Sequence, residues 1–285
     1  MARIELFART EIGCVRERNE DAFVVANISS GERGLRPGTT LQELERGVTL
    51  VGVCDGMGGA AAGDVASRLA AETMYETIMV AAPLRDSLAV QEALLMALLA
   101  ANTAIADHAR THPGKRGMGT TTTAAVVYGY ELHIVHIGDS RAYLRRGRSL
   151  TQLTTDHSVV GQMVATGQLT PEQARSYEHR NVLLQALGVQ PVIQPELVSV
   201  PLRAGDVLLM CSDGLTGPLD DDRILELMLH YEDPVRCCRA LTEAACAAGG
   251  PDNVTVAVAR FVGEGLPIPQ GREPVAARRS SHTLQ

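Results

Sequence analysis

The sequence predicts an α+β protein in which antiparallel sheets carry helices on their outer faces. Segments with the apolar pattern of strands come in groups, and pairs of segments with helical periodicity separate these groups. A parallel sheet would instead alternate single strands with single helices along the chain. The grouped order therefore favours antiparallel sheets with helices layered outside them.

The expected elements follow one another in this grouped order. The first strands are expected at residues 3–10, 22–26 and 48–54, before a glycine-rich turn at 56–63 and helices at 64–80 and 86–110. Strands are then expected at 120–128, 132–137, 141–145 and 150–153, joined by tight turns. The rest of the pattern is short helices at 159–166 and 171–176, strands at 196–200 and 206–211, helices at 220–230 and 234–248, and a strand at 254–261.

Size and composition fit one globular domain. A chain of 285 residues can bury a substantial core, and with only 3% aromatic residues that core must rest on Ala, Val, Leu, Ile and Met. Hydrophobic periodicity stops where Pro and Arg accumulate near the end of the sequence. We therefore expect a domain over residues 1–262 and a poorly ordered tail over residues 263–285.

Several classes of protein are disfavoured. The net charge of −7 and the lack of a basic segment argue against a nucleic-acid partner. The most apolar helical stretch, residues 93–106, is too short to cross a bilayer, and no signal peptide is apparent. We therefore expect a cytoplasmic protein with no membrane partner, and we take it to be a monomer. The cysteines show no CxxC spacing and are expected to be free thiols, with Cys54 and Cys211 buried.

Acidic residues mark the ends of the expected strands. They are Glu20, Asp21, Asp55, Asp139, Asp213 and Asp252. Carboxylates that share a cleft at neutral pH need cations to neutralise them, and an all-oxygen set suits Mg²⁺ or Mn²⁺. Gly56 could bring a backbone carbonyl to such an ion with no Cβ in the way. Any one of these acids alone could be ordinary turn chemistry, because Asp-Gly is a common turn pair.

The segments around these acids resemble a known family. In chain order they are Arg16-Glu17-Arg18-Asn19-Glu20-Asp21, Asp55-Gly56-Met57-Gly58-Gly59, Gly119-Thr120-Thr121, Gly138-Asp139-Ser140-Arg141, Ser212-Asp213-Gly214-Leu215 and Asp252-Asn253. This series resembles the type-2C, metal-dependent (PPM) Ser/Thr protein phosphatases, and the Asp-Gly-Met-Gly-Gly form is similar to their bacterial branch. The resemblance runs from about residue 3 to 261 and implies an α-β-β-α sandwich of two antiparallel sheets flanked by antiparallel helix pairs.

The resemblance also implies which residues bind Mn²⁺ or Mg²⁺, two ions in a core site and a third, weaker one. Asp55 would bridge the two core ions, and the backbone carbonyl of Gly56 would bind one of them. Asp213 and Asp252 would complete the other. Glu20 and Asp21 would act mostly through metal-bound water. Asp139 would help to hold the third ion, together with Asp213.

The implied activity is hydrolysis of phosphoserine and phosphothreonine in proteins, by direct attack of a hydroxide that bridges the core cations. Arg16 would bind the phosphate, so the catalytic residues would be Arg16, Asp55, Asp213 and Asp252. The partners would be phosphorylated proteins, including a Ser/Thr kinase of the Hanks type that the phosphatase opposes.

The general acid for the leaving alcohol is the point at which the chain departs from the family pattern. Eukaryotic members often carry a histidine directly after the Asp-Gly pair, whereas this chain has Met57, which cannot donate a proton. Water near Asp139 is the preferred substitute, and His157 and His179 are candidates only in principle. Residues 155–187 correspond to the variable flap beside the cleft, where either substrate selection or a plain structural excursion would fit.

Three other functions compete with this interpretation. A phosphatase of the same fold could act on a regulator such as an anti-sigma-factor antagonist, although the chain has no room for the usual sensor domain. A non-catalytic phosphoprotein scaffold is disfavoured because every expected acid and Arg16 are present. A P-loop nucleotide-binding enzyme is disfavoured because the GxxxxGK[ST] pattern is absent.

Overall fold

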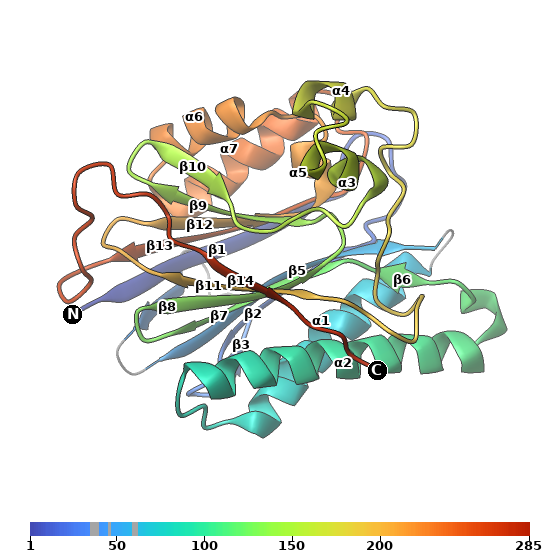
Figure 1. The fold of residues 1–285 in the computed structure, drawn as a ribbon, viewed down its shortest axis with the longest axis horizontal. Coiled ribbons are helices and arrows are strands. Elements are labelled where there is room, and N and C mark those ends of the chain that lie inside the picture. The colour runs from blue at the N-terminus through green and yellow to red at the C-terminus, as the bar shows by residue number, and fades with distance from the viewer. Residues whose placement is uncertain (35–39, 45–46, 59–61) are drawn as a thin grey trace.

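The computed structural model describes residues 1–34, 40–44, 47–58 and 62–285, and these residues form four layers (Figure 1). Two antiparallel sheets pack face to face, and a pair of helices covers the outer face of each. The α+β class that the sequence pattern predicts and the α-β-β-α sandwich that the family resemblance implies are therefore both confirmed. Residues 59–61 of the expected glycine-rich turn lie outside the described residues.

Each sheet draws its strands from both halves of the chain. In spatial order the smaller sheet contains β10 (Ser149–Gln152), β9 (Arg141–Arg146), β12 (Val207–Cys211), β13 (Val254–Val262), β1 (Arg3–Glu11) and β4 (Thr40–Glu43). The larger sheet contains β14 (Arg278–Ser281), β11 (Glu196–Pro201), β8 (Glu131–Ile137), β7 (Thr122–Tyr128), β5 (Val48–Met57), β2 (Asp21–Asn27) and β3 (Glu32–Arg33). A short strand, β6 (Gly119–Thr120), pairs with the end of β5.

The helices fall into two covering pairs and several shorter elements. The larger sheet is covered by α1 (Gly63–Ala81) and α2 (Ser87–Thr111), and the smaller sheet by α6 (Asp221–His230) and α7 (Pro234–Ala247). The shorter elements are the 3₁₀ turn η1 (Pro113–Lys115), α3 (Val159–Ala165), α4 (Pro171–Arg175) and α5 (Asp213–Thr216). Aspartate side chains cap three of the long helices by accepting a backbone N–H of the first turn: Asp86 for α2, Asp220 for α6 and Asp233 for α7.

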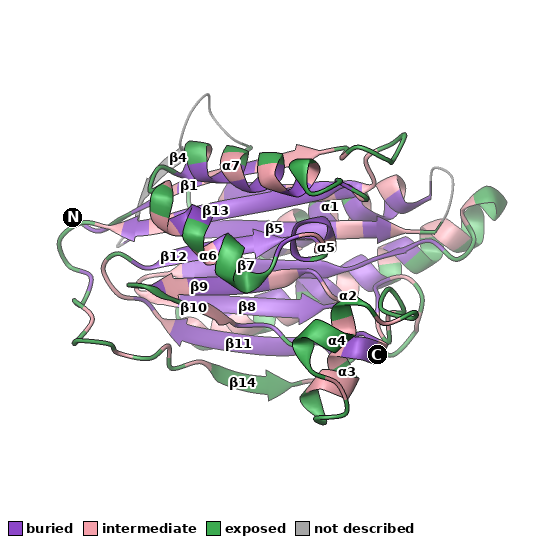
Figure 2. Cartoon of the chain, turned by 90° about the horizontal axis from the view of Figure 1, so that it is seen from above, coloured by how far each residue is buried: buried purple, intermediate pink, exposed green. Residues whose placement is uncertain are grey.

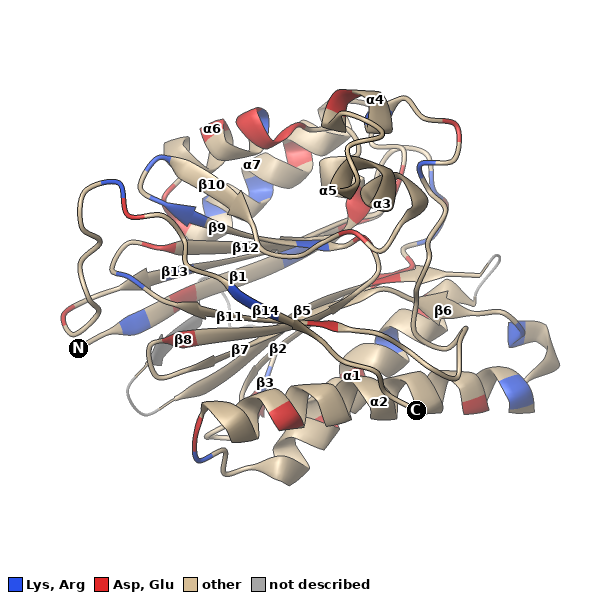
Figure 3. Ribbon diagram, viewed as in Figure 1, with Lys and Arg blue, Asp and Glu red and all other residues tan. Residues whose placement is uncertain are grey.

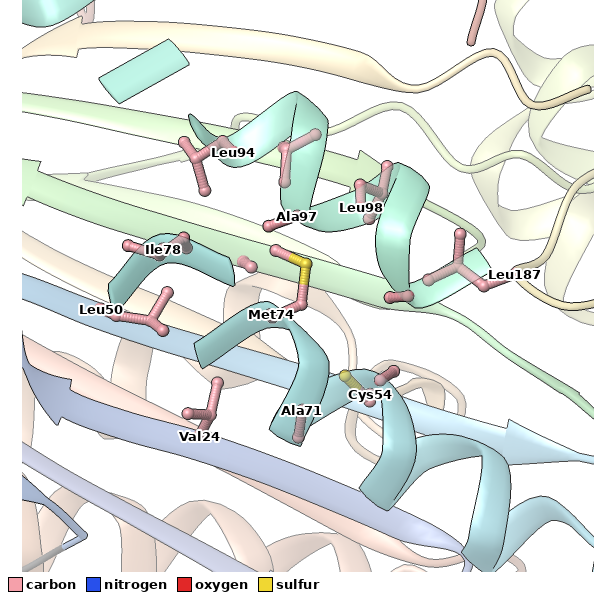
Figure 4. Packing of buried hydrophobic residues seen from close by; sticks show 14 of the residues in the cluster. Val24, Leu50, Cys54, Ala71, Met74, Ile78, Leu94, Ala97, Leu98 and Leu187 are labelled. Carbon is pink, nitrogen blue, oxygen red and sulfur yellow. The ribbon is translucent and has the colours of Figure 1, made fainter. Parts of the chain in front are cut away.

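Three apolar cores separate the four layers. One lies between α1, α2 and the larger sheet, where Met74 of α1 and Leu94 and Leu98 of α2 pack over Leu50 of β5 (Figure 4). A second lies between the two sheets, and a third lies between the smaller sheet and α6 and α7. The strands in the middle of the sandwich are buried along most of their length (Figure 2). The layers thus give the strand ends a rigid support.

Helix α2 is the one helix of the described residues that is long and apolar enough, by length and composition, to cross a membrane. It is longer than residues 93–106, the apolar stretch that we judged too short to cross a bilayer. One side of α2, including Leu94, Leu98 and Ile105, is fully buried against α1 and the larger sheet. This packing accounts for the apolar character of that side within the domain.

The C-terminal segment differs from the prediction of a poorly ordered tail over residues 263–285. Its residues Arg278–Ser281 form β14, which pairs antiparallel with β11 at the edge of the larger sheet. Glu273 forms an ion pair with Arg203 at 2.8 Å, and Leu284 and Ile193 form an isolated β-bridge. The segment is held by backbone pairing and scattered contacts. Its residues show no hydrophobic periodicity, because an exposed edge strand needs no buried face.

Candidate functional site

The acidic residues singled out in the sequence converge at one end of the sandwich. Asp21 and Asp55 are direct register partners on β2 and β5 of the larger sheet. On the smaller sheet, Cys211 at the end of β12 is the register partner of Arg141 in β9 and Val256 in β13. The chain neighbours of these three residues therefore meet at the same end, and Figure 3 shows acidic segments there, near α3 and α5. The neighbouring acids are Asp139, Asp213 and Asp252.

Asp21 joins the two sheets at this end. Its Oδ2 accepts hydrogen bonds from Ser212 Oγ and Thr255 Oγ1, both at 2.7 Å, although Asp21 belongs to the larger sheet and the donors lie on the smaller one. Its Oδ1 is buried and accepts no hydrogen bond from the described residues. Burial raises the pKa of Asp21 to about 7, and the carboxylates of Asp213 and Asp252 also raise it, against the lowering effect of the two hydroxyl donors.

Burial and neighbouring carboxylates raise the pKa values of Asp55, Asp139 and Asp213. Burial raises the pKa of Asp55 well above its usual range, and the nearby carboxylates of Asp21 and Asp213 raise it further. Burial likewise raises the pKa of Asp139 well above its usual range, with Asp213 as the next cause. For Asp213 burial comes first, Asp252 adds to it, and a hydrogen bond with Asp55 opposes it. A bound cation would remove this repulsion, because it stabilises the charged carboxylates.

Hydrogen bonds from a neighbouring strand fix the backbone of Asp55. The Asp55 N–H donates to Thr121 Oγ1 at 3.0 Å, and the Asp55 carbonyl accepts from the Thr121 N–H and from Thr120 Oγ1, both at 2.8 Å. At this point the strand expected over residues 120–128 divides into β6 and β7. The polar run of threonines thus holds the acidic strand in place.

Two glycines allow the chain to close tightly around the acids. A Cβ on Gly56 would lie 2.1 Å from the carbonyl oxygen of Gly63 and 2.6 Å from that of Glu20. A Cβ on Gly63 would lie 2.8 Å from both the Gly56 carbonyl oxygen and Glu20 Oε2. The Gly56 carbonyl and the Glu20 carboxylate therefore lie close together beside Asp55. Asp64 follows Gly63, and its Oδ1 is buried without a hydrogen bond from the described residues.

Arg16 lies at the edge of this group. Its Nη2 forms an ion pair with Asp252 Oδ2 at 2.7 Å, and 52% of the Arg16 side chain is exposed. The loop that carries Arg16 is fastened at its end by Asn253, whose side chain accepts the Glu20 N–H at 2.7 Å and donates to the Arg18 carbonyl at 2.8 Å. The guanidinium therefore stands next to the carboxylates but remains open to solvent.

The flap expected at residues 155–187 is tied to the site at both ends. The N–H of His157 donates to the carbonyl of Gly138 at 2.7 Å, directly before Asp139. At the other end, Leu187 and Thr120 exchange two backbone hydrogen bonds of 2.9 and 3.1 Å. Between these ties lie the helices α3 and α4. Of the two histidines considered as proton donors, His157 is near Asp139, whereas His179 is exposed on the flap.

The donor set fits hard divalent cations. Every acidic group here offers oxygen ligands, and two of the oxygens, on Asp21 and Asp64, are buried with no donor in the described residues. Among those residues, however, no three Asp, Glu, His or Cys side chains already form a complete metal-binding group. Asp252 instead forms an ion pair with Arg16, so its carboxylate would have to leave Arg16 to bind an ion.

Two acidic residues of this region were missed from the sequence. In the sequence, the position of Asp64 is typical of an acid in the first turn of a helix, and that of Asp156 is typical of a loop residue. The proximity of Asp64 to Glu20 raises the pKa of Glu20, after burial as the main cause, and Asp156 similarly raises the pKa of Asp139. The position of Asp64 directly after the glycine-rich turn could have indicated that it belongs to the site. However, an acid in the first turn of a helix is also favoured by the helix dipole, so this position alone is not specific.

Known proteins are similar to this chain in sequence and fold. A family model described as Protein phosphatase 2C matches residues 38–245. Serine/threonine protein phosphatase PstP of Mycobacterium tuberculosis is 40% identical over 266 residues, which cover 92% of this chain and 46% of PstP. The chain thus spans about half the length of that relative.

Two further matches cover nearly the full length of both chains. Serine/threonine phosphatase stp of Listeria monocytogenes is 32% identical over 248 residues, 87% of this chain and 92% of the relative. The solved catalytic domain of PstP in complex with two manganese ions has a TM-score of 0.74 at 36% identity, covering 92% of this chain and 100% of that one.

Proposed function

The chain belongs to the protein phosphatase 2C family, and on this premise we propose that it is a metal-dependent protein Ser/Thr phosphatase acting on phosphoserine and phosphothreonine. The observation that carries the proposal is the convergence of Asp21, Asp55, Asp139 and Asp213 from both sheets at one end of the sandwich. Buried carboxylates that repel one another are costly unless they serve to bind cations.

The cation ligands would come from both sheets. Asp55 would bridge two ions, the carbonyl of Gly56 would bind one of them, and Asp213 and Asp252 would complete the other. Glu20 and Asp21 would act mainly through water, and Asp139 with Asp213 would hold a third, weaker ion. In support, the related PstP domain is described in complex with two manganese ions. When bound, Mn²⁺ or Mg²⁺ would supply a nucleophilic water at neutral pH and neutralise charge on the phosphate.

Arg16 would bind the phosphate of the substrate. Its planar guanidinium can donate two parallel hydrogen bonds to phosphate oxygens, and it is already placed beside Asp252 with half of its side chain exposed. An incoming phosphate would take the place of the Asp252 carboxylate on Arg16. The same exchange would free Asp252 to bind a cation, so the two events would support each other.

The leaving alcohol needs a proton from a group other than Met57. Water held near Asp139 is the donor that we favour, because the Asp139 carboxylate is near both Asp213 and Asp156 at the start of the flap, and their charges raise its pKa. The imidazole of His157 accepts the Gly138 N–H at 3.4 Å through Nδ1, and burial lowers its pKa, which makes it a poor proton reservoir at neutral pH.

Finer points of the function are also proposals. The substrates would be phosphoproteins, among them a Ser/Thr kinase whose action this enzyme reverses in signalling. The enzyme would work as a cytoplasmic monomer. Charge supports the absence of a nucleic-acid partner, because the net charge is −7.

Hydrolysis of para-nitrophenyl phosphate and of a phosphothreonine peptide tests the central proposal. Mn²⁺ or Mg²⁺ should support both reactions, and EDTA, Asp55→Asn and Asp213→Asn should each abolish them. Full activity in EDTA would rule out the metal mechanism. Inactivity with every divalent ion, combined with retained phosphopeptide binding, would support a scaffold instead.

The role of Arg16 has its own test and a matched control in the same loop. Arg16→Ala should raise KM for the phosphopeptide more than it lowers kcat, since it removes binding of the phosphate. Arg18→Ala alters another exposed arginine that engages Asn253 only through its backbone carbonyl, and it should leave KM unchanged. Equal KM values for all three proteins would remove the assigned role of Arg16.

A further inference from the structure

Two cysteines that are distant in the sequence meet beside the carboxylate site. Cys14 lies exposed in the loop between β1 and β2, and Cys246 lies half-buried in the last turn of α7. Cys14 Sγ is 3.6 Å from the backbone oxygen of Cys246. The point that a Cβ on Gly250 would occupy is 2.9 Å from Cys14 Sγ and 3.1 Å from Cys246 Cα. The bare Gly250 therefore leaves room for the two thiols to lie side by side.

The backbone keeps this arrangement in place. The Cys14 N–H donates to the Gly250 carbonyl at 2.8 Å, and the Gly249 N–H donates to the Cys246 carbonyl at 3.0 Å. These contacts hold the backbones of both residues against the same short turn at residues 249–250, with the Cys14 sulfur 3.6 Å from the Cys246 backbone oxygen. The other cysteines cannot compete for an external oxidant, because all four are buried: Cys54, Cys211, Cys237 and Cys238.

We propose that Cys14 and Cys246 are a reversible redox pair that forms a disulfide when the protein meets a peroxide. The Cys14 thiolate attacks one peroxide oxygen, the O–O bond breaks, and the products are a sulfenic acid on Cys14 and, after protonation, water. The Cys246 sulfur then attacks the sulfenic sulfur, the S–O bond breaks, and the hydroxyl leaves as a second water. The two thiols lose two electrons and the peroxide gains them. A cellular dithiol or dithiothreitol reverses the reaction by thiol–disulfide exchange.

The disulfide would affect the Arg16–Asp252 ion pair because of where the two cysteines lie. Cys14 shares its loop with Arg16, and Cys246 lies at the helix end that leads through Gly250 to Asp252. The cross-link would tie together the two segments that carry the Arg16–Asp252 ion pair. Arg16 would then stay on Asp252, and phosphate would compete less well for it. This consequence, unlike the cross-link itself, rests on the proposed phosphatase function.

Peptide mapping of the full chain tests the cross-link directly. The purified protein is treated with hydrogen peroxide, alkylated, digested without reductant and measured by mass spectrometry. We expect a joined peptide that contains Cys14 and Cys246, that dithiothreitol releases, and that Cys14→Ser prevents. Cys237→Ser is the matched control in the same helix and should leave the joined peptide unchanged. Higher oxidation of Cys14 with no joined peptide would overturn the proposal.

Kinetics separate the cross-link from its effect. Oxidised wild type should show a severalfold higher KM for a phosphothreonine peptide with a smaller change in kcat, and reduction should restore it. Cys14→Ser should keep the reduced wild-type KM under the same peroxide treatment. A joined peptide with unchanged KM would overturn the effect on Arg16. A joined peptide in a protein that lacks activity even when reduced would count against the proposed function and not against the redox pair.

Discussion

Arg141 holds Asp156 through one edge of its guanidinium, with Nε and Nη2 both donating. Nε donates to the two carboxylate oxygens at 2.9 and 3.1 Å, and Nη2 donates to Oδ2 at 2.7 Å. Arg141 begins β9 directly after the Asp139 segment, whereas Asp156 stands at the start of the flap. Nη1 also donates to the Tyr143 hydroxyl at 2.9 Å, and that hydroxyl donates to Asp221 at 3.0 Å. A continuous set of polar contacts thus joins the flap, the acidic site and α6.

Replacing Asp156 should weaken both the fold and the site. Asp156→Asn removes the charge that pairs with Arg141 and leaves a largely buried guanidinium under-satisfied, at a cost on the order of 2 kcal/mol in unfolding free energy. We also expect kcat/KM to fall, because the flap loses its side-chain tie to Arg141, one of its two ties beside Asp139. Urea titration and phosphopeptide kinetics measure the two effects. Asp107→Asn, in an exposed ion pair with Arg110, should change the stability by less than about 0.5 kcal/mol. Equal stabilities of both variants would contradict this role.

Divalent cations should stabilise the folded protein through the acidic site. Mn²⁺ at about a hundred times its dissociation constant should add about 2.7 kcal/mol to the unfolding free energy, because it binds the folded chain only. Asp55→Asn should lose most of this gain, since the bridging carboxylate would become a neutral amide. Thermal unfolding across a Mn²⁺ titration measures both proteins. The same gain in Asp55→Asn as in the wild type would place the ions elsewhere.

A methyl group at Gly56 should disrupt the site through its backbone. Gly56→Ala would place Cβ 2.1 Å from the Gly63 carbonyl oxygen, and the chain must shift to relieve this contact. Such overpacking costs about 1–3 kcal/mol, and the shift should also lower Mn²⁺ affinity. Gly114→Ala is the control, because its Cβ would meet no atom within 4 Å. Denaturant unfolding and Mn²⁺ titration should separate the two variants. Indistinguishable results would show that the tight approach has no effect on either property.

His136 should make the protein less stable in acid. Burial is the main cause that lowers the pKa of His136 to about 3, with His157 as the next cause. An unfolded histidine titrates near about 6.5, so between these values the unfolded chain binds a proton that the folded chain does not. Stability from this group is therefore complete above pH ~6.5 and is lost as the pH falls toward ~3.

The variant His136→Gln isolates this effect from that of the acidic site. Its unfolding free energy should depend less on pH below ~6.5, by up to about 1.4 kcal/mol per pH unit relative to the wild type. Urea unfolding at several pH values between about 4 and 7.5 gives the two slopes. Parallel slopes would mean that His136 takes up its proton in the folded protein. Thr123, which contacts His136 Nδ1 at 2.8 Å, is kept unchanged in the comparison.

Much of the fold could be predicted because its elements have strong local patterns. The strand Val48–Met57 starts with a mainly apolar run, residues 48–54, which leads directly into Asp55 and Gly56, and α2 has a long Ala/Leu pattern with a capping aspartate. These signals depend on neighbouring residues only. The same holds for the acids of the site, which stand out because each follows or precedes such a run.

Features made by distant segments could not be predicted in this way. The Arg16–Asp252 ion pair joins residues 236 positions apart, and no local pattern records that β1 and β13 lie side by side. Asp64 was missed because a helix start explains an acid without any partner. The pairing of β14 with β11 was missed because backbone hydrogen bonds depend little on residue type.

The strand β14 also bears on how the protein behaves at high concentration. Without it, β11 would be the edge of the larger sheet, and its backbone groups would offer a template to strands of other molecules. With it, the edge is a strand of four exposed residues that carries the two cations Arg278 and Arg279. Short, charged edge strands resist pairing between molecules. We therefore expect β14 to protect this edge of the sheet from pairing with other molecules.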